Sequence, residues 1–363
     1  MKKFFFCIAA IFVMALYMPV TAQTVYHKFY DDAKERLAVE GMMKSKDIRV
    51  GEWTWYHPNG EIYRQGSYDD NGRKIGIWKT FYENGAKWTE DCFDNGFNRI
   101  WYQSGQLKSE VPVVDGSREG EAKEWHIDGK IMFEGTYRDD ELNGMGVWWT
   151  RSGNKDMEGM LVDGQQDGVW KYYWVSNGRI GVEGTYTNGH QTGVWKYYYE
   201  TGERWREGKY VDGNKQGVWT TWYESGRKLH EGEYVDDLED GKWTAWYESG
   251  KVDYVGNFEE GKKNGTWTGY YDDGRERYKM EYKDDEKDGE EIRYFPNGKI
   301  ETRYHYSAGI LNGTFERFNS AGKPEEAGTF LNGEREGAWK VYDEYGKVAM
   351  EAKFHDGKMV NRK

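Results

Sequence analysis

The sequence predicts an all-β fold: an elongated, single-layer antiparallel β-meander built from about thirteen 24-residue β-hairpin repeats. Three observations support this prediction. A 24-residue pattern recurs along nearly the whole chain, and its segments are rich in Trp, Tyr, Thr and Val, which favour strands. Turn pairs that contain Gly separate these segments, as expected for hairpins.

The repeat is clearest where two neighbouring segments read GVWKYYYETGERWREGKYVDGNKQ (193–216) and GVWTTWYESGRKLHEGEYVDDLED (217–240). Sliding this pattern along the chain finds thirteen units, whose first positions differ in number by 24, apart from two steps of 25 and one of 20. They begin at Gly51, Gly76, Gly96, Gly120, Gly144, Gly168, Gly193, Gly217, Gly241, Gly265, Gly289, Gly313 and Gly337. Residues 51–363 therefore form one array.

Aromatic columns run through the units, and aromatic residues make up 17% of the chain. We expect the columns to be the core of a sheet that has no second layer. The third position holds Trp53, Trp78, Trp170, Trp195, Trp219, Trp243, Trp267 and Trp339, and the aromatic sixth position includes Trp222 and Trp246. The third position is instead Asn98, Ala122, Glu291 or Phe315 in four units, and in the unit at Gly144 the tryptophan is displaced to Trp148.

A glycine stands at the tenth position of the units, between the two strand-like segments. Such a position suits a tight turn, because glycine adopts positive φ without strain. The turn glycines include Gly60, Gly85, Gly202, Gly226, Gly250, Gly274 and Gly298. A second turn, such as Asp212-Gly213, links each hairpin to the next.

The register of a hairpin follows from an even-numbered tight loop, which pairs the third position with the sixteenth. Trp195 then lies opposite Gly208, and its ring is expected to cover that bare backbone. Tyr210, at the eighteenth position, joins the same face, whereas Trp222 falls on the other face.

Residues 1–23 resemble a secretory signal peptide, with Lys2 and Lys3 ahead of an apolar run and small residues at Thr21 and Ala22. The sequence thus predicts export to the periplasm, the outer envelope or the extracellular space, without membrane insertion after cleavage. Residues 24–50 are predicted to be a partial repeat that caps the array. The alternative for 32–39 is a short helix, because this stretch is polar and helix-compatible.

Charge and cysteine content narrow the possible partners. The formal net charge is −12, and loss of Lys2 and Lys3 with residues 1–23 gives −14. This balance opposes nucleic acid and anionic lipid as partners. Cys7 lies in the signal, so Cys92 is the single cysteine of the mature chain, and we expect it to be a small sheet residue without a disulfide.

Segments such as NGHQTGVWKYYYETG (188–202) and GKKNGTWTGYYDDG (261–274) resemble the MORN repeat in its bacterial variant form, found in proteins described as YwqK-family antitoxins. The resemblance covers nearly the whole mature chain. It implies an elongated antiparallel sheet that scaffolds proteins or lies near membranes, and the antitoxin description implies a protein partner. Export departs from a cytoplasmic antitoxin role.

The sequence carries no pattern typical of catalysis or of a cofactor. No His-x-x-x-His or cysteine pair indicates zinc, and no nucleophile elbow or phosphate-binding glycine loop is present. The acidic turn at 284–289 begins like a calcium loop, but its twelfth position is Phe295 instead of Glu. We therefore predict no catalytic residues, no metal, no cofactor and no enzymatic activity.

Two binding hypotheses remain. In the first, the sheet is a protein–protein interaction scaffold, antitoxin-like or envelope-associated, for a protein partner of unknown identity. In the second, exposed aromatic side chains bind a glycan of the cell envelope. The candidates for binding are Trp88 and Trp205, which lie outside the main columns, together with the irregular stretch 92–160.

Overall fold

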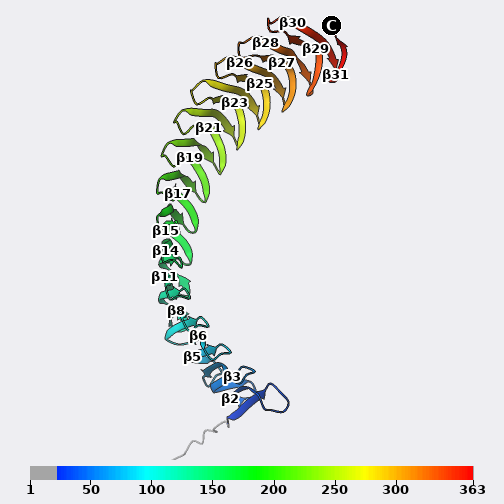
Figure 1. The fold of residues 1–363 in the computed structure, drawn as a ribbon. Coiled ribbons are helices and arrows are strands. Elements are labelled where there is room, and N and C mark those ends of the chain that lie inside the picture. Colours follow the sequence, from blue (N-terminus) through cyan, green and yellow to red (C-terminus); the bar gives the residue numbers. More distant parts are fainter. Residues whose placement is uncertain (1–22, 363) are drawn as a thin grey trace, which may run out of the picture. The chain divides into compact units, whose positions relative to one another are not determined.

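The computed structural model describes residues 23–362 and divides the chain into two compact units, with the boundary in the sequence between Ile131 and Met132. The predicted signal peptide, 1–23, lies outside the described residues apart from Gln23. All regular elements between residues 23 and 362 are β-strands, which confirms the all-β prediction (Figure 1). No helix in this part of the chain is long and apolar enough to cross a membrane.

Unit 1 is an antiparallel meander from β1 to β8, after which β8 pairs with both β9 and β10. Its strands are β1 (Thr24–Phe29), β2 (Leu37–Ser45), β3 (Ile48–Tyr56), β4 (Ile62–Tyr68), β5 (Lys74–Phe81), β6 (Lys87–Cys92), β7 (Gly96–Trp101), β8 (Leu107–Val114), β9 (Ser117–Arg118) and β10 (Gly120–Trp125).

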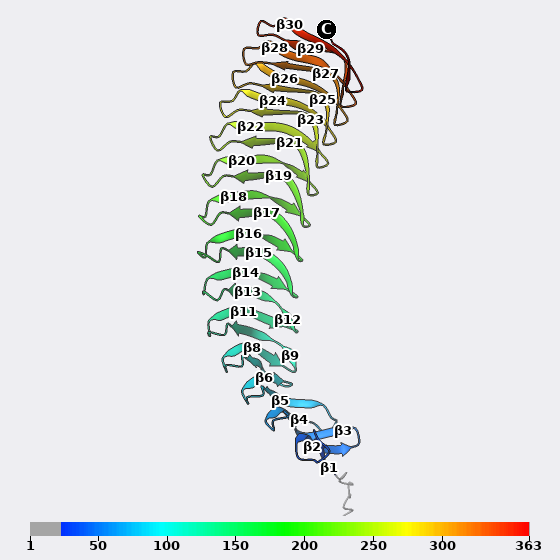
Figure 2. The same ribbon diagram turned by 45° about the vertical axis from the view of Figure 1, so that its right-hand side comes forward.

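Unit 2 continues the same hairpin pattern, with successive strands stacked side by side (Figure 2). Its strands are β11 (Ile131–Arg138), β12 (Glu141–Leu142), β13 (Gly144–Trp149), β14 (Lys155–Val162), β15 (Gln165–Tyr173), β16 (Ile180–Thr187), β17 (His190–Tyr198), β18 (Arg204–Val211), β19 (Asn214–Trp222), β20 (Lys228–Val235), β21 (Leu238–Trp246), β22 (Val252–Glu259), β23 (Lys262–Tyr270), β24 (Glu276–Lys283), β25 (Glu286–Tyr294), β26 (Ile300–Ser307), β27 (Ile310–Phe318), β28 (Pro324–Leu331), β29 (Glu334–Tyr342), β30 (Val348–His355) and β31 (Lys358–Arg362).

The N-terminal segment 24–50 is made of strand and turn, with β2 beginning at Leu37. The helix-compatible interpretation of 32–39 is therefore wrong. Gly41 in β2 lies under the ring of Trp53, the relation that joins neighbouring units farther along the chain. That this segment acts as a cap stays a prediction.

The strands begin earlier than the repeat pattern suggests. β17 starts at His190, ahead of Gly193, which has φ of 65° at an irregularity in the pairing of neighbouring strands. Each opening glycine of this kind therefore forms a bulge inside a strand and does not begin it. A bulge adds residues on one strand and re-aims the side chains that follow.

In the short unit at Gly76, side-chain hydrogen bonds support the shortened connection between β6 and β7, residues 93–95. β6 ends at Cys92, whose backbone N–H donates to Asn98 Oδ1 at 2.6 Å. The Asp115 N–H donates to Asn95 Oδ1 at 3.0 Å. Cys92 is buried and carries a free thiol.

Candidate binding surface

The sheet has two chemically different faces in each unit. We call the side that carries the third-position tryptophans the tryptophan face, and the side that carries the second, fourth, sixth, fifteenth, seventeenth and nineteenth positions the opposite face. The pairing of Trp195 with Gly208 and of Val194 with Lys209 illustrates the assignment. The two faces carry different ladders and leave different surfaces exposed.

On the tryptophan face, the third-position rings form a buried ladder. The strand pairing of these residues agrees with the predicted register, but the glycine that each ring covers differs from the prediction. Trp195 is opposite Gly208 and Trp219 is opposite Gly232, as expected from the register. However, the ring that covers Gly208 is Trp219 of the following unit, because the bulge at Gly217 turns the next strand across the glycine.

The same tryptophans also satisfy the backbone at the bulge. The Trp219 indole N–H donates to the carbonyl of Lys209 at 3.3 Å, and Trp195 does the same to Thr185 at 3.2 Å. Each ring therefore links its own hairpin to the preceding one through both packing and a hydrogen bond. All eight predicted third-position tryptophans are buried: Trp53, Trp78, Trp170, Trp195, Trp219, Trp243, Trp267 and Trp339.

Tyrosines and cations complete this ladder. Tyr210 lies edge-on between Trp195 and Trp219, with ring centroids 5.8 and 5.0 Å away. The Arg206 guanidinium lies 4.6 Å from the Trp219 ring centroid, and Lys215 Nζ lies 5.7 Å from it. Burial and the nearby Arg206 charge lower the pKa of Lys215.

Units without a third-position tryptophan fill the same space in other ways. Trp148, two residues along its strand, stays on the same face and covers Gly146 of its own strand. Glu291 is buried and forms ion pairs with Lys287 Nζ and Arg293 Nε, each at 2.7 Å. Met280 occupies the position of the covered glycine beside Glu291. In these two units the ladder position is therefore filled, although the column looks broken in the sequence.

The opposite face carries a second ladder built from the sixth position. Trp222 and Trp246 lie there, next to Arg204 and Lys228 of the preceding hairpins, with cation-to-centroid distances of 5.3 and 5.5 Å. Where the sixth residue is Tyr198, its hydroxyl donates to Glu183 at 2.8 Å. Burial and this bond raise the pKa of Tyr198 to about 12.

The predicted turn glycines all lie at positive φ, between 78° and 95°: Gly60, Gly85, Gly202, Gly226, Gly250, Gly274 and Gly298. In the turn at Gly60, Asn59 is not left-handed; its side chain instead accepts the Glu61 N–H at 3.0 Å. In the second turn, Asp212 and Gly213 both have positive φ, as in a type I′ hairpin.

An exposed apolar stripe runs along the opposite face of four consecutive repeats in unit 2. Its second-position residues Val169, Val194 and Val218 are 57%, 52% and 60% exposed. We define the apolar stripe as Met145, Met160, Val162, Val169, Val194, Val211, Val218 and Val235. In the next repeats the second position is Lys242, Thr266, Glu290 and Thr314.

The two candidate tryptophans are both partly exposed, Trp88 at 41% and Trp205 at 42%. Trp88 stacks on Tyr82 at 5.5 Å in unit 1. In unit 2, the ring centroid of Trp205 lies 6.2 Å from those of Tyr197 and Tyr199. Each ring thus keeps a free surface while it packs on tyrosines of its own hairpin.

The turn edge of unit 2 is hollowed in two adjoining places. One hollow has a volume of about 580 Å³ and includes Asp288, His305, Leu331 and Glu336. The other, of about 540 Å³, includes Glu259, Lys262, Asn264 and again Asp288. Because they share Asp288, we describe them together as the turn-edge trough.

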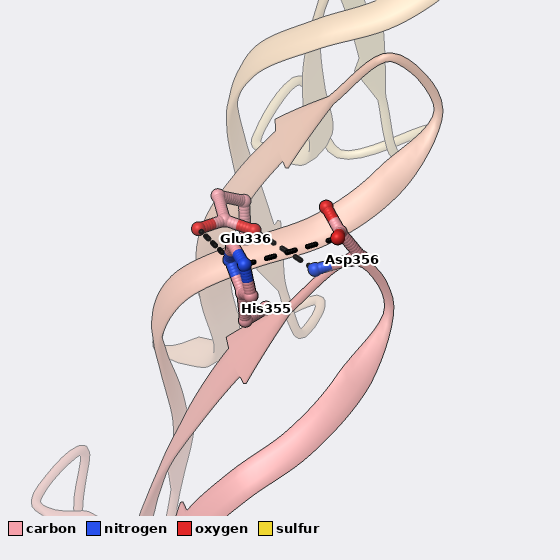
Figure 3. A group of neighbouring side chains, drawn as sticks. All are labelled: Glu336, His355 and Asp356. Carbon is pink, nitrogen blue, oxygen red and sulfur yellow. Dashed lines mark hydrogen bonds and ion pairs between the residues drawn. The ribbon is translucent and has the colours of Figure 1, made fainter.

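Glu336, His355 and Asp356 come together at the last hairpin turn of unit 2 (Figure 3). His355 Nδ1 lies 3.2 Å from Glu336 Oε1, and the Asp356 N–H donates to Glu336 Oε2 at 3.1 Å. The bond from His355 lowers the pKa of Glu336, and Glu336 raises that of His355. Asp288 stands at the same repeat position as Glu336 and accepts the Ala308 N–H of an equivalent turn at 3.1 Å, so a capping role accounts for Glu336.

Sequence inspection missed the apolar stripe, the trough and this trio. A search for apolar residues at outward-facing strand positions could have found the stripe, because valines recur at the second and nineteenth positions of neighbouring units. The trough and the trio depend on turns that belong to different hairpins, and no short motif marks them.

An open antiparallel sheet of repeated hairpins, with packed aromatic ladders, defines a β-repeat protein. The family described as "MORN repeat variant" matches residues 49–70, 74–95, 118–139, 191–212, 239–260 and 287–308. The chain is a MORN-repeat protein of the variant type, as its sequence suggested. Each matched segment holds one whole hairpin, beginning just before the opening glycine.

No curated protein matches the chain. Among solved structures, the crystal structure of TcdB2-TccC3 is 11% identical and aligns over 92% of this chain and 23% of that chain, with a TM-score of 0.16. The structure of the Tc holotoxin pore of Photorhabdus luminescens is 12% identical. It aligns over 92% of this chain and 22% of that chain, with a TM-score of 0.15. This chain thus spans about a quarter of those chains, and scores this low carry no argument about it.

Proposed function

We propose that this protein is an exported, non-enzymatic scaffold that holds another protein along the opposite face of unit 2. MORN repeats are typical of repeat proteins that mediate binding, and the chain is built from them. The apolar stripe is the observation that carries the proposal. It places exposed apolar side chains on four neighbouring repeats, where packing within the sheet does not use them.

The repeat itself does not require this stripe. Other units of the same fold hold Lys242, Thr266 or Glu290 where the stripe holds Val194 or Val218. Apolar surface left in water forfeits about 25 cal/mol per Å² relative to its burial. Four neighbouring repeats with apolar residues on this face therefore favour a partner that buries them.

Export and charge restrict the identity of the partner. The signal-like residues 1–23 favour an envelope or extracellular protein, and an antitoxin-like or envelope-associated role fits both the export and the repeat family. The acidic balance of the chain opposes nucleic acid and anionic lipid.

A glycan is the second candidate ligand, because Trp88 and Trp205 expose ring surface that could stack on sugars. This alternative needs no apolar stripe. The two hypotheses therefore respond to different substitutions.

The test is a pull-down from envelope extract with the purified chain, run beside a glycan array. We expect one protein in stoichiometric amount, lost with Val194→Ser plus Val218→Ser. The matched control is Val175→Ser plus Val348→Ser, which changes two exposed valines outside the stripe. If the captured protein is lost with both variant pairs, or with neither, the stripe is not the binding surface. Glycan signal that is abolished by Trp88→Ala and Trp205→Ala, without a protein partner, would establish the alternative.

A further inference from the structure

Asparagine–glycine pairs recur at the turns and bulges of the array, and one pair in unit 2 has a contact of its own kind. The Gly265 N–H donates to Oδ1 of Asn264, the residue directly before it, at 3.1 Å. On its other side, Asn264 Nδ2 donates to Glu259 Oε2. The side-chain carboxamide is therefore held with its oxygen towards the next backbone nitrogen and its amino group towards a carboxylate.

In the hairpin turns, the glycine nitrogen of such a pair is held by the backbone instead. The Gly298 N–H donates to the carbonyl of Phe295 at 2.8 Å, and the Asn297 side chain accepts the N–H of Lys299, two residues on, at 3.0 Å. In the turn between β16 and β17, the Gly189 N–H donates to a backbone carbonyl of β15 at 2.9 Å. These nitrogens thus point away from the asparagine that precedes them.

Two other pairs stand at the same repeat position as Asn264-Gly265, directly at the opening bulge of a unit. They are Asn143-Gly144 and Asn312-Gly313. Among the asparagine–glycine pairs between residues 23 and 362, Asn264-Gly265 alone has a hydrogen bond from the glycine N–H to the asparagine side chain. The other two pairs are therefore controls with the same dipeptide at the same place in the hairpin.

Solvent and space are both available at Asn264. Asn264 and Gly265 line the hollow of about 540 Å³ at the turn edge, so water reaches the pair. An ideal Cβ on Gly265 would meet no atom within 4 Å. Packing therefore does not resist a small shift of the backbone nitrogen towards the carboxamide carbon.

We propose that Asn264 is a site of spontaneous deamidation, with water as the co-reactant. The Gly265 nitrogen loses its proton to solvent hydroxide and attacks Asn264 Cγ, and the new N–Cγ bond closes a succinimide ring. The Cγ–Nδ2 bond breaks, and Nδ2 takes up a solvent proton and leaves as ammonia. Water then adds to one of the two ring carbonyls and opens the ring to aspartate or isoaspartate. The contact at 3.1 Å supplies the positioning on which such intramolecular reactions depend.

Either product weakens the turn between β22 and β23. Aspartate places a second carboxylate against Glu259, where the amide now donates a hydrogen bond. Isoaspartate lengthens the main chain of β23 by one carbon at the residue that pairs with Asn257. This inference does not depend on the proposed scaffold function.

The test follows deamidation of the purified full chain, kept folded at neutral pH, by proteolytic digestion and mass spectrometry at successive times. Asn264 should deamidate about tenfold faster than Asn143 and Asn312, because the held contact lowers the entropic part of its barrier. A rate at Asn264 equal to or below the rates of the two controls would overturn the proposal.

The same measurement on the chain unfolded in urea separates structure from local sequence. All three asparagines precede glycine, so their rates should become similar once the folded contacts are lost. If Asn264 keeps its lead in urea, its reactivity comes from neighbouring residues in the sequence, and the structural assignment is wrong.

Variants test the consequence for the fold. Asn264→Asp imitates one product and should lower the melting temperature, whereas Asn264→Gln keeps a neutral amide and should change it less. Addition of Glu259→Gln to Asn264→Asp should recover part of the loss, because the new amide can donate to the aspartate. Equal melting temperatures of Asn264→Asp and Asn264→Gln would overturn the weakening of the turn, while the deamidation rates decide the reaction itself.

Discussion

At the scale of single residues, the fold depends on the contact between a tryptophan and a glycine of the preceding hairpin. A Cβ on Gly208 would collide with the Trp219 ring, and the same holds for Gly184 with Trp195 and for Gly232 with Trp243. Glycine at this position therefore makes room for a ring. Its lack of a side chain matters more here than its backbone freedom.

A double-mutant cycle tests this coupling. Trp219→Ala should lower the free energy of unfolding by about 3–5 kcal/mol, as for other buried aromatics. Gly208→Ala should destabilise through overpacking, by about 1–3 kcal/mol. In chemical denaturation, the double variant should lose less free energy of unfolding than the sum of the two single losses. The reason is that the alanine methyl group fills part of the space that the ring leaves. Strict additivity would mean that the ring and the glycine do not share one site.

Glu291 gives a residue-scale prediction about pH. Burial opposes its ionisation, but hydrogen bonds from Lys287 and Arg293 outweigh burial and lower its pKa. A carboxyl with a lowered folded-state pKa contributes stability above its unfolded pKa of about 4.3, and loses it as pH falls through the folded value.

Thermal denaturation between pH 7 and pH 3 measures this contribution. The wild type should lose more stability below about pH 4.3 than Glu291→Gln, which has no charge to titrate. Glu290→Gln is the control, because the neighbouring Glu290 is exposed on the opposite face. If wild type and Glu291→Gln lose stability in parallel with acid, the buried ion pairs do not contribute as described.

At the scale of elements, two kinds of turn alternate and impose different demands. In the first, only the glycine is left-handed, as with Gly226 at φ 82°. In the second, two consecutive residues are both left-handed, as with Asp212 and Gly213. An ideal Cβ on Gly226 meets no atom within 4 Å, so any effect of substitution there comes from backbone strain alone.

Gly226→Val should therefore destabilise the chain by about 2 kcal/mol, the range for an L residue held in a left-handed conformation. Ser225→Val, in the same turn but without positive φ, is the matched control and should change stability much less. Urea denaturation of both variants measures the difference. Equal stability of the two variants would refute the turn assignment.

At the scale of the whole molecule, the array is held by contacts between neighbouring strands. In unit 2, β11 pairs with both β12 and β13, and from β13 on each strand contacts the next in sequence. The ladder links each hairpin only to those beside it. Removal of one hairpin should therefore leave the others able to close the gap. In a deletion of 217–240, Trp243 takes the place of Trp219 above Gly208.

This deletion of one whole repeat should give a soluble protein with a β-type circular dichroism spectrum and cooperative unfolding at a somewhat lower temperature. Size-exclusion chromatography and a thermal melt test this outcome. A variant that lacks half a repeat should not fold, because removal of one strand reverses the direction in which the next strand must run. An insoluble product from the whole-repeat deletion would show that the hairpins are not interchangeable.

The sequence by itself determined the period, the strand content, the hairpin register and the identity of the packing aromatics. These follow from local rules, since a hairpin's turn and its alternating side chains lie within one repeat. The tertiary structure decided that Trp219 covers Gly208 of the preceding hairpin and that Trp148 and Glu291 continue the ladder. It also decided which valines stay exposed and that Asp288 and Glu336 share a trough. Those relations cross from one hairpin to the next through bulges, and a bulge re-aims side chains by an amount that spacing in the sequence does not encode.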